Sequence, residues 1–251
     1  MAAYLIVSDI HGNREALEAV LDDARGRFAA ILCLGDLVGY GADPNAVAEW
    51  AKSNAASVIR GNHDRACTGN DSLEYFNPAA RASALWTRGA LTPDNASYLE
   101  HLARGPLHVT PNGAPGALRQ DFDLVHGSPL DEDEYLVGLE DVQFLREHLD
   151  KKLTFFGHTH LQGGFLLAAR GVKRCPPGQV VQLEADDYYL INPGSVGQPR
   201  DGDPRAAYAL YSPEDRTVEF RRVPYDVGQA AAKILEAGLP ESLAMRLFEG
   251  V

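Results

Sequence analysis

Five short apolar segments of this chain are each followed at once by a cluster of polar side chains that can bind metal ions. In chain order, the clusters are Asp9-x-His11, Gly35-Asp36, Gly61-Asn62-His63-Asp64, His126-Gly127 and Gly157-His158-x-His160. Short apolar runs of this kind are typical of strands buried on both faces of a sheet. A fold in which several such strands end at one edge would bring carboxylates, imidazoles and an amide together.

The first part of the chain alternates strand and helix signals. Residues 4–7, 29–34 and 57–59 are apolar, which predicts three buried strands. Between them, a helix is expected from Arg14 onward, with Asn13 placed to cap its start, and a second helix over residues 44–53. This alternation predicts an open α/β sheet whose functional groups gather outside the carboxyl ends of the strands.

Two further helices, at residues 78–91 and 93–102, carry few groups able to perform chemistry. Each has a proline in its first turn, as helices often do. We interpret about residues 70–105 as a helical insertion that packs beside or partly over the site. The insertion belongs to a single domain that spans residues 1–251. An acidic loop at 131–134 and a helix at 139–149 follow later in the chain.

The second half of the chain reads mainly as strands separated by Gly, Pro and Asp turns. The expected strands lie at residues 122–125, 153–156, 165–168, 180–184, 188–191, 206–211 and 217–223, and two short helices follow at 227–235 and 241–248. From residue 165 onward the alternation with helices stops, which predicts a second, largely antiparallel sheet. The fold class is therefore α/β with an α+β character, namely two sheets flanked by helices.

The composition excludes several classes of partner. Lysine and arginine number 23 against 35 aspartate and glutamate residues, which gives a formal net charge of −12. Binding to a nucleic-acid backbone or to an anionic membrane relies on basic patches, so neither is expected. The three cysteines are too few and too scattered for a disulfide framework or a thiolate zinc site. With no signal peptide and no run of roughly 20 apolar residues, we expect a cytoplasmic protein.

Each polar cluster alone has a plain structural explanation. Asp9-x-His11 and Gly35-Asp36 are ordinary turn or capping sequences, Asn62-His63-Asp64 could cap a helix, and His126 could be a buried core histidine. Together they form a mixed nitrogen and oxygen set that suits Mn, Fe, Zn or Ni. If the chain stays extended after each strand, the two side chains of each i, i+2 pair point the same way and can meet one ion. Two ions sharing Asp36 could clamp a phosphoryl oxygen and generate a hydroxide for in-line attack. Such ions would also allow an acidic protein to hold a phosphate.

The five clusters, in this order, resemble the motifs of the calcineurin-like metallophosphoesterases. The resemblance runs from Asp9 to about Ser195, and residues 192–200 are similar to a loop of the small bacterial and archaeal phosphodiesterase-like members. It implies a four-layer α/β/β/α fold built on a two-sheet β-sandwich. It also implies a cofactor of two divalent transition metal ions, and manganese is the metal that we expect. One ion would be held by Asp9, His11, Asp36 and His160, and the other by Asp36, Asn62, His126 and His158.

The resemblance also assigns roles beside the metals. His63 would stabilise the phosphoryl group or protonate the leaving oxygen, and Asp64 would orient that imidazole and keep it charged, unless it is simply a helix cap. The arginine that protein Ser/Thr phosphatases and diadenosine tetraphosphatases carry after the Gly-Asp motif is absent from residues 37–41. The candidate substrate-binding residues are Asn62, Asn13 and Arg200. Asn13 precedes a helix N-terminus, where anions are favoured, and Arg200 ends the loop at residues 192–200.

The expected activity is hydrolysis of a phosphodiester, a phosphomonoester or a dinucleoside polyphosphate by a dinuclear phosphoesterase. The partner would be a small phosphorylated or nucleotide substrate. Two alternatives stay open at this stage. One is a monoesterase similar to the protein Ser/Thr phosphatases, and the other is a binding scaffold that keeps the fold without the chemistry. The oligomeric state, the natural substrate and the native metals are left open by the sequence.

Overall fold

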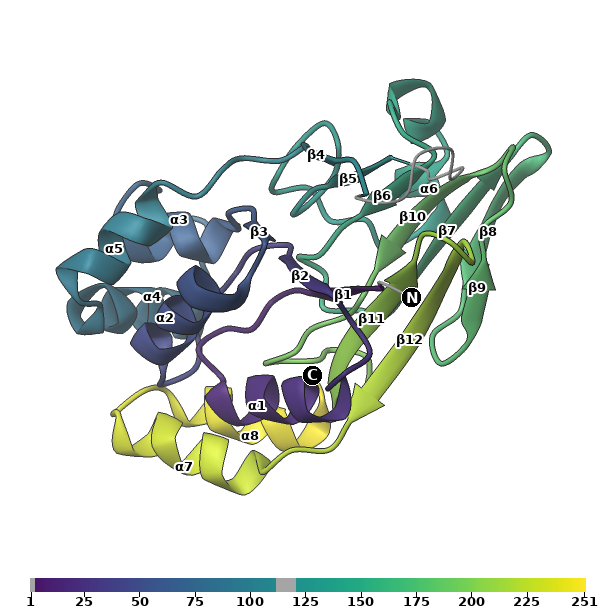
Figure 1. Ribbon diagram of the computed structural model, residues 1–251. Coiled ribbons are helices and arrows are strands. Elements are labelled where there is room, and N and C mark those ends of the chain that lie inside the picture. Colours follow the sequence, from purple (N-terminus) through teal and green to yellow (C-terminus); the bar gives the residue numbers. More distant parts are fainter. Residues whose placement is uncertain (1–2, 112–120) are drawn as a thin grey trace.

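Two six-stranded sheets lie face to face in the computed structural model, which describes residues 3–111 and 121–251 (Figure 1). The first sheet has the order β3 (Ser57–Val58), β2 (Ala30–Cys33), β1 (Tyr4–Val7), β11 (Ala206–Ser212), β12 (Thr217–Val223) and β9 (Val180–Gln182). The second has the order β4 (Leu107–Val109), β5 (Phe122–Leu124), β6 (Leu153–Phe155), β10 (Tyr188–Asn192), β7 (Gly163–Ala168) and β8 (Gly171–Cys175). The predicted two-sheet fold flanked by helices is thus confirmed.

Each sheet has a parallel part and an antiparallel part. β1, β2 and β3 are mutually parallel, and so are β5, β6 and β10. The expectation that all strands from residue 165 onward form one second sheet is wrong. β7, β8 and β10 join β5 and β6, whereas β11 pairs with β1 in the register Leu5↔Leu210 and carries β12 and β9 with it. Strand partners are chosen by long-range packing, which the alternation of residues along a strand does not encode.

The core between the sheets explains the apolar runs. In β1, Ile6 faces the second sheet, whereas Leu5 and Val7 face the helices on the other side. The inner layer is filled by aromatic side chains, and the rings of Phe122, Phe155 and Tyr211 pack with centroids 5.2–5.6 Å apart. Burial of one such side chain contributes about 1.5–3 kcal/mol.

Helices cover the outer faces of both sheets. α1 (Arg14–Asp23), α7 (Val227–Glu236) and α8 (Glu241–Glu249) lie together in Figure 1, and α2 (Pro44–Asn54), α3 (Asn62–Thr68), α4 (Pro78–Ala90) and α5 (Pro93–Glu100) form a second group. α1 packs on β11 and β12 of the first sheet. The outer face of the second sheet is covered by α6 (Leu139–Val142) and a 3₁₀ turn (Leu145–His148). The prediction of a single helix at 139–149 is therefore wrong. The helix is interrupted before Phe144, whose side chain is 75% exposed.

The predicted insertion contains α4 and α5, which contact α2 and α3. The assignment of residues 1–251 to one domain stays a prediction. α3, β4 and β8 were absent from the sequence-based expectation.

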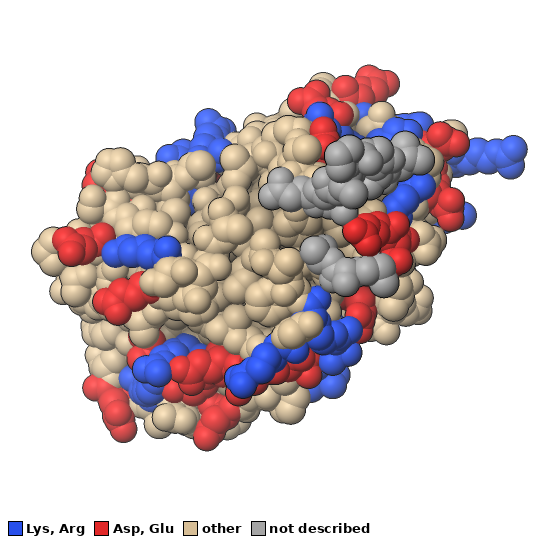
Figure 2. Space-filling view, viewed as in Figure 1, with Lys and Arg blue, Asp and Glu red and all other residues tan. Residues whose placement is uncertain are grey.

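Figure 2 shows acidic and basic side chains next to one another near α1 and α7, while the centre of this face carries few charges. Among the residues that the structure describes, no helix is long and apolar enough to cross a membrane.

Candidate metal centre

The loops that follow the strands are joined by backbone hydrogen bonds that extend the sheets. Beyond the β1–β2 ladder, Asp9 N donates to Gly35 O at 3.0 Å and His11 N donates to Asp36 O at 2.9 Å. In the second sheet, Gly157 N donates to His126 O at 2.8 Å. The two sheets meet where His158 N donates to the Asp9 carboxylate at 3.2 Å. The predicted convergence of functional groups at the carboxyl ends of the strands is confirmed for these loops.

Two groups of ligand atoms lie side by side in these loops. Asp9, His11 and His160 form one group, and within it the candidate ligand atoms lie within 4.8 Å of one another. Asp36, His126 and His158 form the other under the same limit. All six side chains are buried, with at most 4% of any residue exposed. Asn62 belongs beside the second group, since its Oδ1 lies 3.3 Å from His126 Nε2.

Asp36 lies between the two groups. Its Oδ2 is 3.6 Å from His11 Nε2 and 3.5 Å from His126 Nε2, and these nitrogens belong to different groups. Its Oδ1 accepts a 2.8 Å hydrogen bond from His63 N, which fixes the carboxylate. One oxygen that faces both groups at similar distances is the arrangement that a bridging ligand requires.

The prediction from the i, i+2 spacing is confirmed for Asp9 and His11, which lie in one group, but it is wrong in two other respects. The backbone after the strands is left-handed and not extended, with φ of 53° at Asp9 and 50° at His11. His158 and His160 also separate, since each lies in a different group. This division is the one that the family resemblance implies.

The histidines are oriented by backbone carbonyls. Nδ1 of His11, His126 and His160 lies 3.0, 2.8 and 2.6 Å from the carbonyl oxygens of Val38, Leu34 and Gln198. A carbonyl only accepts, so each Nδ1 carries a proton and the Nε2 atom faces the centre. His158 is turned the other way, because its Nε2 donates to Asp133 O at 3.1 Å.

This orientation creates a strong requirement for a cation. Burial holds the pKa of His11 and that of His160 well below the usual value, so both rings are neutral at pH 7. Their unprotonated Nε2 atoms then face each other at 3.1 Å. Asp9 Oδ1, 3.4 Å from His160 Nε2, is buried and has no hydrogen-bond partner among the described residues. Lone pairs that converge in a buried site without donors fit a metal ion.

The second group has a different electrostatic balance. Burial opposes charge at both His126 and Asp36, but their mutual attraction prevails. It raises the pKa of His126 to about 10, and His126 and His63 together hold the pKa of Asp36 well below its usual range. In the absence of an ion the two side chains thus form a charged pair. A metal ion would take the place of the His126 proton.

His63 lies beside the centre and is 5% exposed, and its ring packs 4.9 Å from the ring of His11. Burial lowers its pKa to about 4. The expectation that Asp64 orients this imidazole and keeps it charged is wrong. The Asp64 carboxylate accepts hydrogen bonds from the backbone amides of Gly61, Asp36, Leu37 and Val38, and within the described residues His63 Nδ1 has no hydrogen-bond partner. Asp64 therefore caps α3 and fixes the Asp36 loop.

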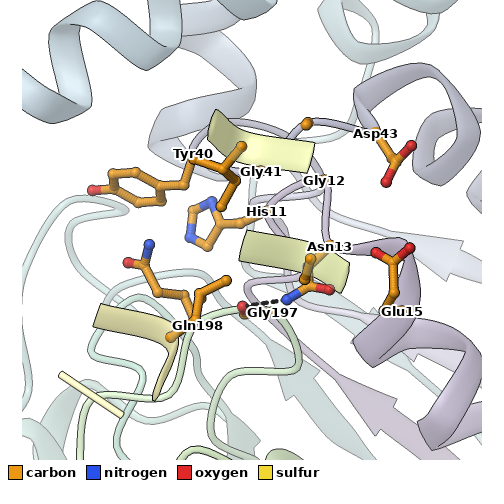
Figure 3. Close-up of a pocket in the computed structure, with 13 residues that line it drawn as sticks. His11, Gly12, Asn13, Glu15, Tyr40, Gly41, Asp43, Gly197 and Gln198 are labelled. Atoms are coloured by element: carbon orange, nitrogen blue, oxygen red, sulfur yellow. Dashed lines mark hydrogen bonds between the residues drawn. The ribbon is translucent and has the colours of Figure 1, made fainter. Parts of the chain in front are cut away.

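The two remaining candidate substrate ligands differ. Figure 3 shows the Asn13 amide directed at the Gly197 carbonyl, to which its Nδ2 donates at 2.8 Å, while its Oδ1 caps α1 by accepting from Ala16 N at 3.0 Å. Both polar atoms of the Asn13 side chain thus bond the protein itself, and its role in substrate binding stays a prediction. Arg200 lies over the Tyr40 ring, 5.6 Å from its centroid, and its buried Nε has no partner among the residues described.

Comparison with known proteins agrees with this geometry. A family model described as the calcineurin-like phosphoesterase superfamily domain matches residues 3–216. The chain belongs to this superfamily. It is similar to the uncharacterized protein MJ0912 of Methanocaldococcus jannaschii, with 39% identity over 249 residues, 98% of this chain and 97% of that protein.

Two solved structures share the phosphoesterase fold over the whole chain. A metallophosphoesterase from Sphaerobacter thermophilus is 40% identical with a TM-score of 0.84, covering 100% of this chain and 99% of that one. The hypothetical protein PH1004 from Pyrococcus horikoshii OT3 is 20% identical with a TM-score of 0.79 at the same coverage, which shows similarity of fold alone. The family thus supports divalent metal binding by the two ligand groups, whereas it does not identify the metal.

Tyr40 is a residue of this phosphoesterase site that the sequence did not reveal. Seven non-glycine residues in the described ranges have positive φ, and five of them are the candidate ligands Asp9, His11, Asp36, His158 and His160. Tyr40, with φ of 60°, is the sixth, and its ring contacts those of His11 and His63 with centroids 4.7 and 4.4 Å apart. Such strained backbone costs about 1–3 kcal/mol per residue and clusters at functional sites. The backbone amide of Tyr40 is held by Ser83 of α4, so the predicted insertion supports this wall of the site.

Gly61 permits the close approach of two motifs, which gives a testable prediction. A Cβ atom at Gly61 would lie 2.0 Å from Asp36 Oδ1 and 2.6 Å from Asp36 N. We expect Gly61→Ala to displace the Asp36 carboxylate, lower the bound metal, and reduce the free energy of unfolding by about 1–3 kcal/mol. Urea unfolding and elemental analysis would measure both effects. Gly89→Ala, in α4 with nothing within 4 Å of the added atom, is the matched control. It should keep the metal content and should not lower the free energy of unfolding, since alanine favours a helix more than glycine does.

Proposed function

We propose that this chain is a dinuclear metal-dependent phosphoesterase that hydrolyses a phosphodiester of a small or nucleotide substrate. The single observation that supports two ions is the position of Asp36 Oδ2, 3.6 and 3.5 Å from imidazole nitrogens of the two ligand groups. Manganese is our expectation for the native metal, with Fe, Zn and Ni as alternatives that the same ligands suit. When bound, the ions supply Lewis-acid polarisation of the phosphoryl group and activate the attacking water.

The protein's own side chains would hold the ions, orient the substrate and exclude water. Asp9, His11, Asp36 and His160 would hold one ion, and Asp36, Asn62, His126 and His158 the other. In this proposal, His63 would donate a hydrogen bond to the phosphoryl group or a proton to the leaving oxygen. The burial of the ligands supports catalysis, because charges act more strongly where water is excluded.

Chelation is the direct test of metal dependence. We expect purified protein supplied with Mn²⁺ to hydrolyse bis-p-nitrophenyl phosphate, and EDTA followed by gel filtration to abolish this activity. Restoring Mn²⁺ should restore it. A protein that binds two ions but hydrolyses no diester, monoester or dinucleoside polyphosphate would be the binding scaffold instead, and the proposed activity would be wrong.

Arg200 gives a second test that concerns the phosphate. Its Nη2 donates to Gln198 Oε1 at 2.9 Å, while its buried Nε has no hydrogen-bond partner within the part of the chain that the structure describes. Arg200→Met keeps the side-chain length and removes the charge. A hydrogen bond to a charged group contributes about 1.5–3 kcal/mol, so we expect kcat/KM for the diester to fall roughly 10- to 100-fold. Arg170→Met, at an exposed position in the β7–β8 turn, should have no effect, and equal activities of the two variants would remove Arg200 from the site.

A further inference from the structure

A cavity of about 420 Å³ opens beside the metal centre. Asn62, His63 and His158 are among its lining residues, so a substrate group held in the cavity would lie next to a phosphate bound at the candidate metal centre. Its side walls come from two loops, residues 71–77 before α4 and residues 133–135 after β5. The volume lies within the range usual for pockets that hold small organic ligands.

The charges of this cavity disfavour a second phosphate. Arg65 is the one cation among the described residues that line it, and its guanidinium is already surrounded by acids. It lies 2.7 Å from Asp71, 2.6 Å from Glu132 and 2.8 Å from Asp133. Glu132 is also paired with Arg60 and Arg104, so it adds no net charge. The charged side chains that line the cavity itself are Arg65, Asp71 and Asp133, and one cation with two anions makes this lining negative. The part of the substrate that enters this cavity is therefore expected to be uncharged.

The walls present aromatic rings instead. Tyr40, Tyr75, Phe76 and Tyr135 all line the cavity. Tyr75 is 92% exposed, and Tyr135, with 52% exposed, rests on the ring of the candidate ligand His158 with centroids 3.9 Å apart. Phe76 packs edge-on against His63 at 5.0 Å. Large aromatic side chains left uncovered beside a reacting centre are suited to stack against a planar ring.

We propose that this cavity binds the nucleobase of a nucleotide phosphodiester, stacked on Tyr75 and Tyr135, while its phosphate lies at the metal centre. The inference rests on the proposed phosphoesterase function and adds the class of substrate. Arg65 acts as a positioning residue, because its contacts with Asp71 and Asp133 tie together the two loops that carry these tyrosines.

The test compares two ligands that differ only in the base. They are the phosphonate analogues of adenosine 5′-phosphate and ribose 5-phosphate, whose C–P bond is not hydrolysed. Titration calorimetry on the Mn²⁺-loaded protein measures each Kd without turnover, so the result does not depend on diesterase activity. We expect the adenosine analogue to bind at least about tenfold more tightly, as stacking of one base on an aromatic side chain usually provides.

Variants then locate the effect. Tyr75→Ala and Tyr135→Leu should each remove most of this preference while changing the Kd of the ribose analogue much less. Phe144→Ala, exposed like Tyr75 but outside the cavity, should retain the preference. Equal Kd values for the two analogues in the wild-type protein, or a base preference that survives both tyrosine substitutions, would overturn the proposal. Loss of diesterase activity with an intact base preference would instead count against the proposed function alone.

Discussion

Replacing Asp36 with asparagine should remove more than one metal ion per chain and lower kcat/KM for a phosphodiester by roughly 1,000-fold. The reason is that Asp36 Oδ2 faces both ligand groups, at 3.6 Å from His11 Nε2 and 3.5 Å from His126 Nε2. Losing the polarisation and water activation that metal ions supply raises the barrier by several kcal/mol, and about 4 kcal/mol corresponds to this factor. The isosteric amide can still accept the hydrogen bond from His63 N, so the fold should survive.

Two further variants make the Asp36 result specific. His160→Ala affects a ligand that faces one group only, so it should remove one ion and leave the other. Asp123→Asn changes an aspartate that is 8% exposed and bonds His108 on the neighbouring strand, and it should leave the metal content at two ions per chain. Elemental analysis of the three proteins after identical loading is the measurement. Equal losses from Asp36→Asn and His160→Ala would mean that Asp36 serves a single ion.

The second large effect is expected for His63→Ala, which should lower kcat by about 100- to 10,000-fold while both ions remain bound. His63 is buried beside the ligands, but its ring belongs to neither ligand group. Its backbone amide, which holds Asp36, is unchanged by the substitution. Turnover by this variant of diesters with leaving groups of different basicity is the measurement.

The dependence on leaving group separates the two roles proposed for His63. If its imidazole protonates the leaving oxygen, the loss should be largest for an alkoxide and small for p-nitrophenolate, which leaves without a proton. If it stabilises the phosphoryl group by a hydrogen bond, the loss should be similar for both. A variant that loses metal together with activity would show instead that His63 is a ligand.

The candidate ligand set could be predicted from sequence because each member follows a strand. The residue type, the preceding apolar run and the order of the clusters are all local features, and Asp9, Asp36 and His126 lie where these features place them. The backbone conformation of the loops could not be predicted from the sequence in the same way. The left-handed backbone at Asp9 and Asp36 is imposed by hydrogen bonds to neighbouring loops, which an alternation of apolar residues does not reveal.

The failures have a common physical origin in long-range contacts. The division of the later strands between the sheets depends on β11 pairing with β1 and on β10 pairing with β6, across most of the chain. Asp64 looked like a partner of His63 because the two are adjacent in sequence, but its carboxylate is taken by backbone amides from residues 36–38. The aromatic cavity was hidden for the same reason, since Tyr75 and Tyr135 come to line one cavity only in the folded chain.

Whether two ions share Asp36 can be decided by anomalous diffraction from crystals of the Mn²⁺-loaded protein. We expect two anomalous peaks about 3.5–4 Å apart, with the Asp36 carboxylate between them. One peak should lie beside Asp9, His11 and His160, and the other beside Asn62, His126 and His158. A single peak in fully loaded crystals, or two peaks of which only one contacts Asp36, would contradict this prediction.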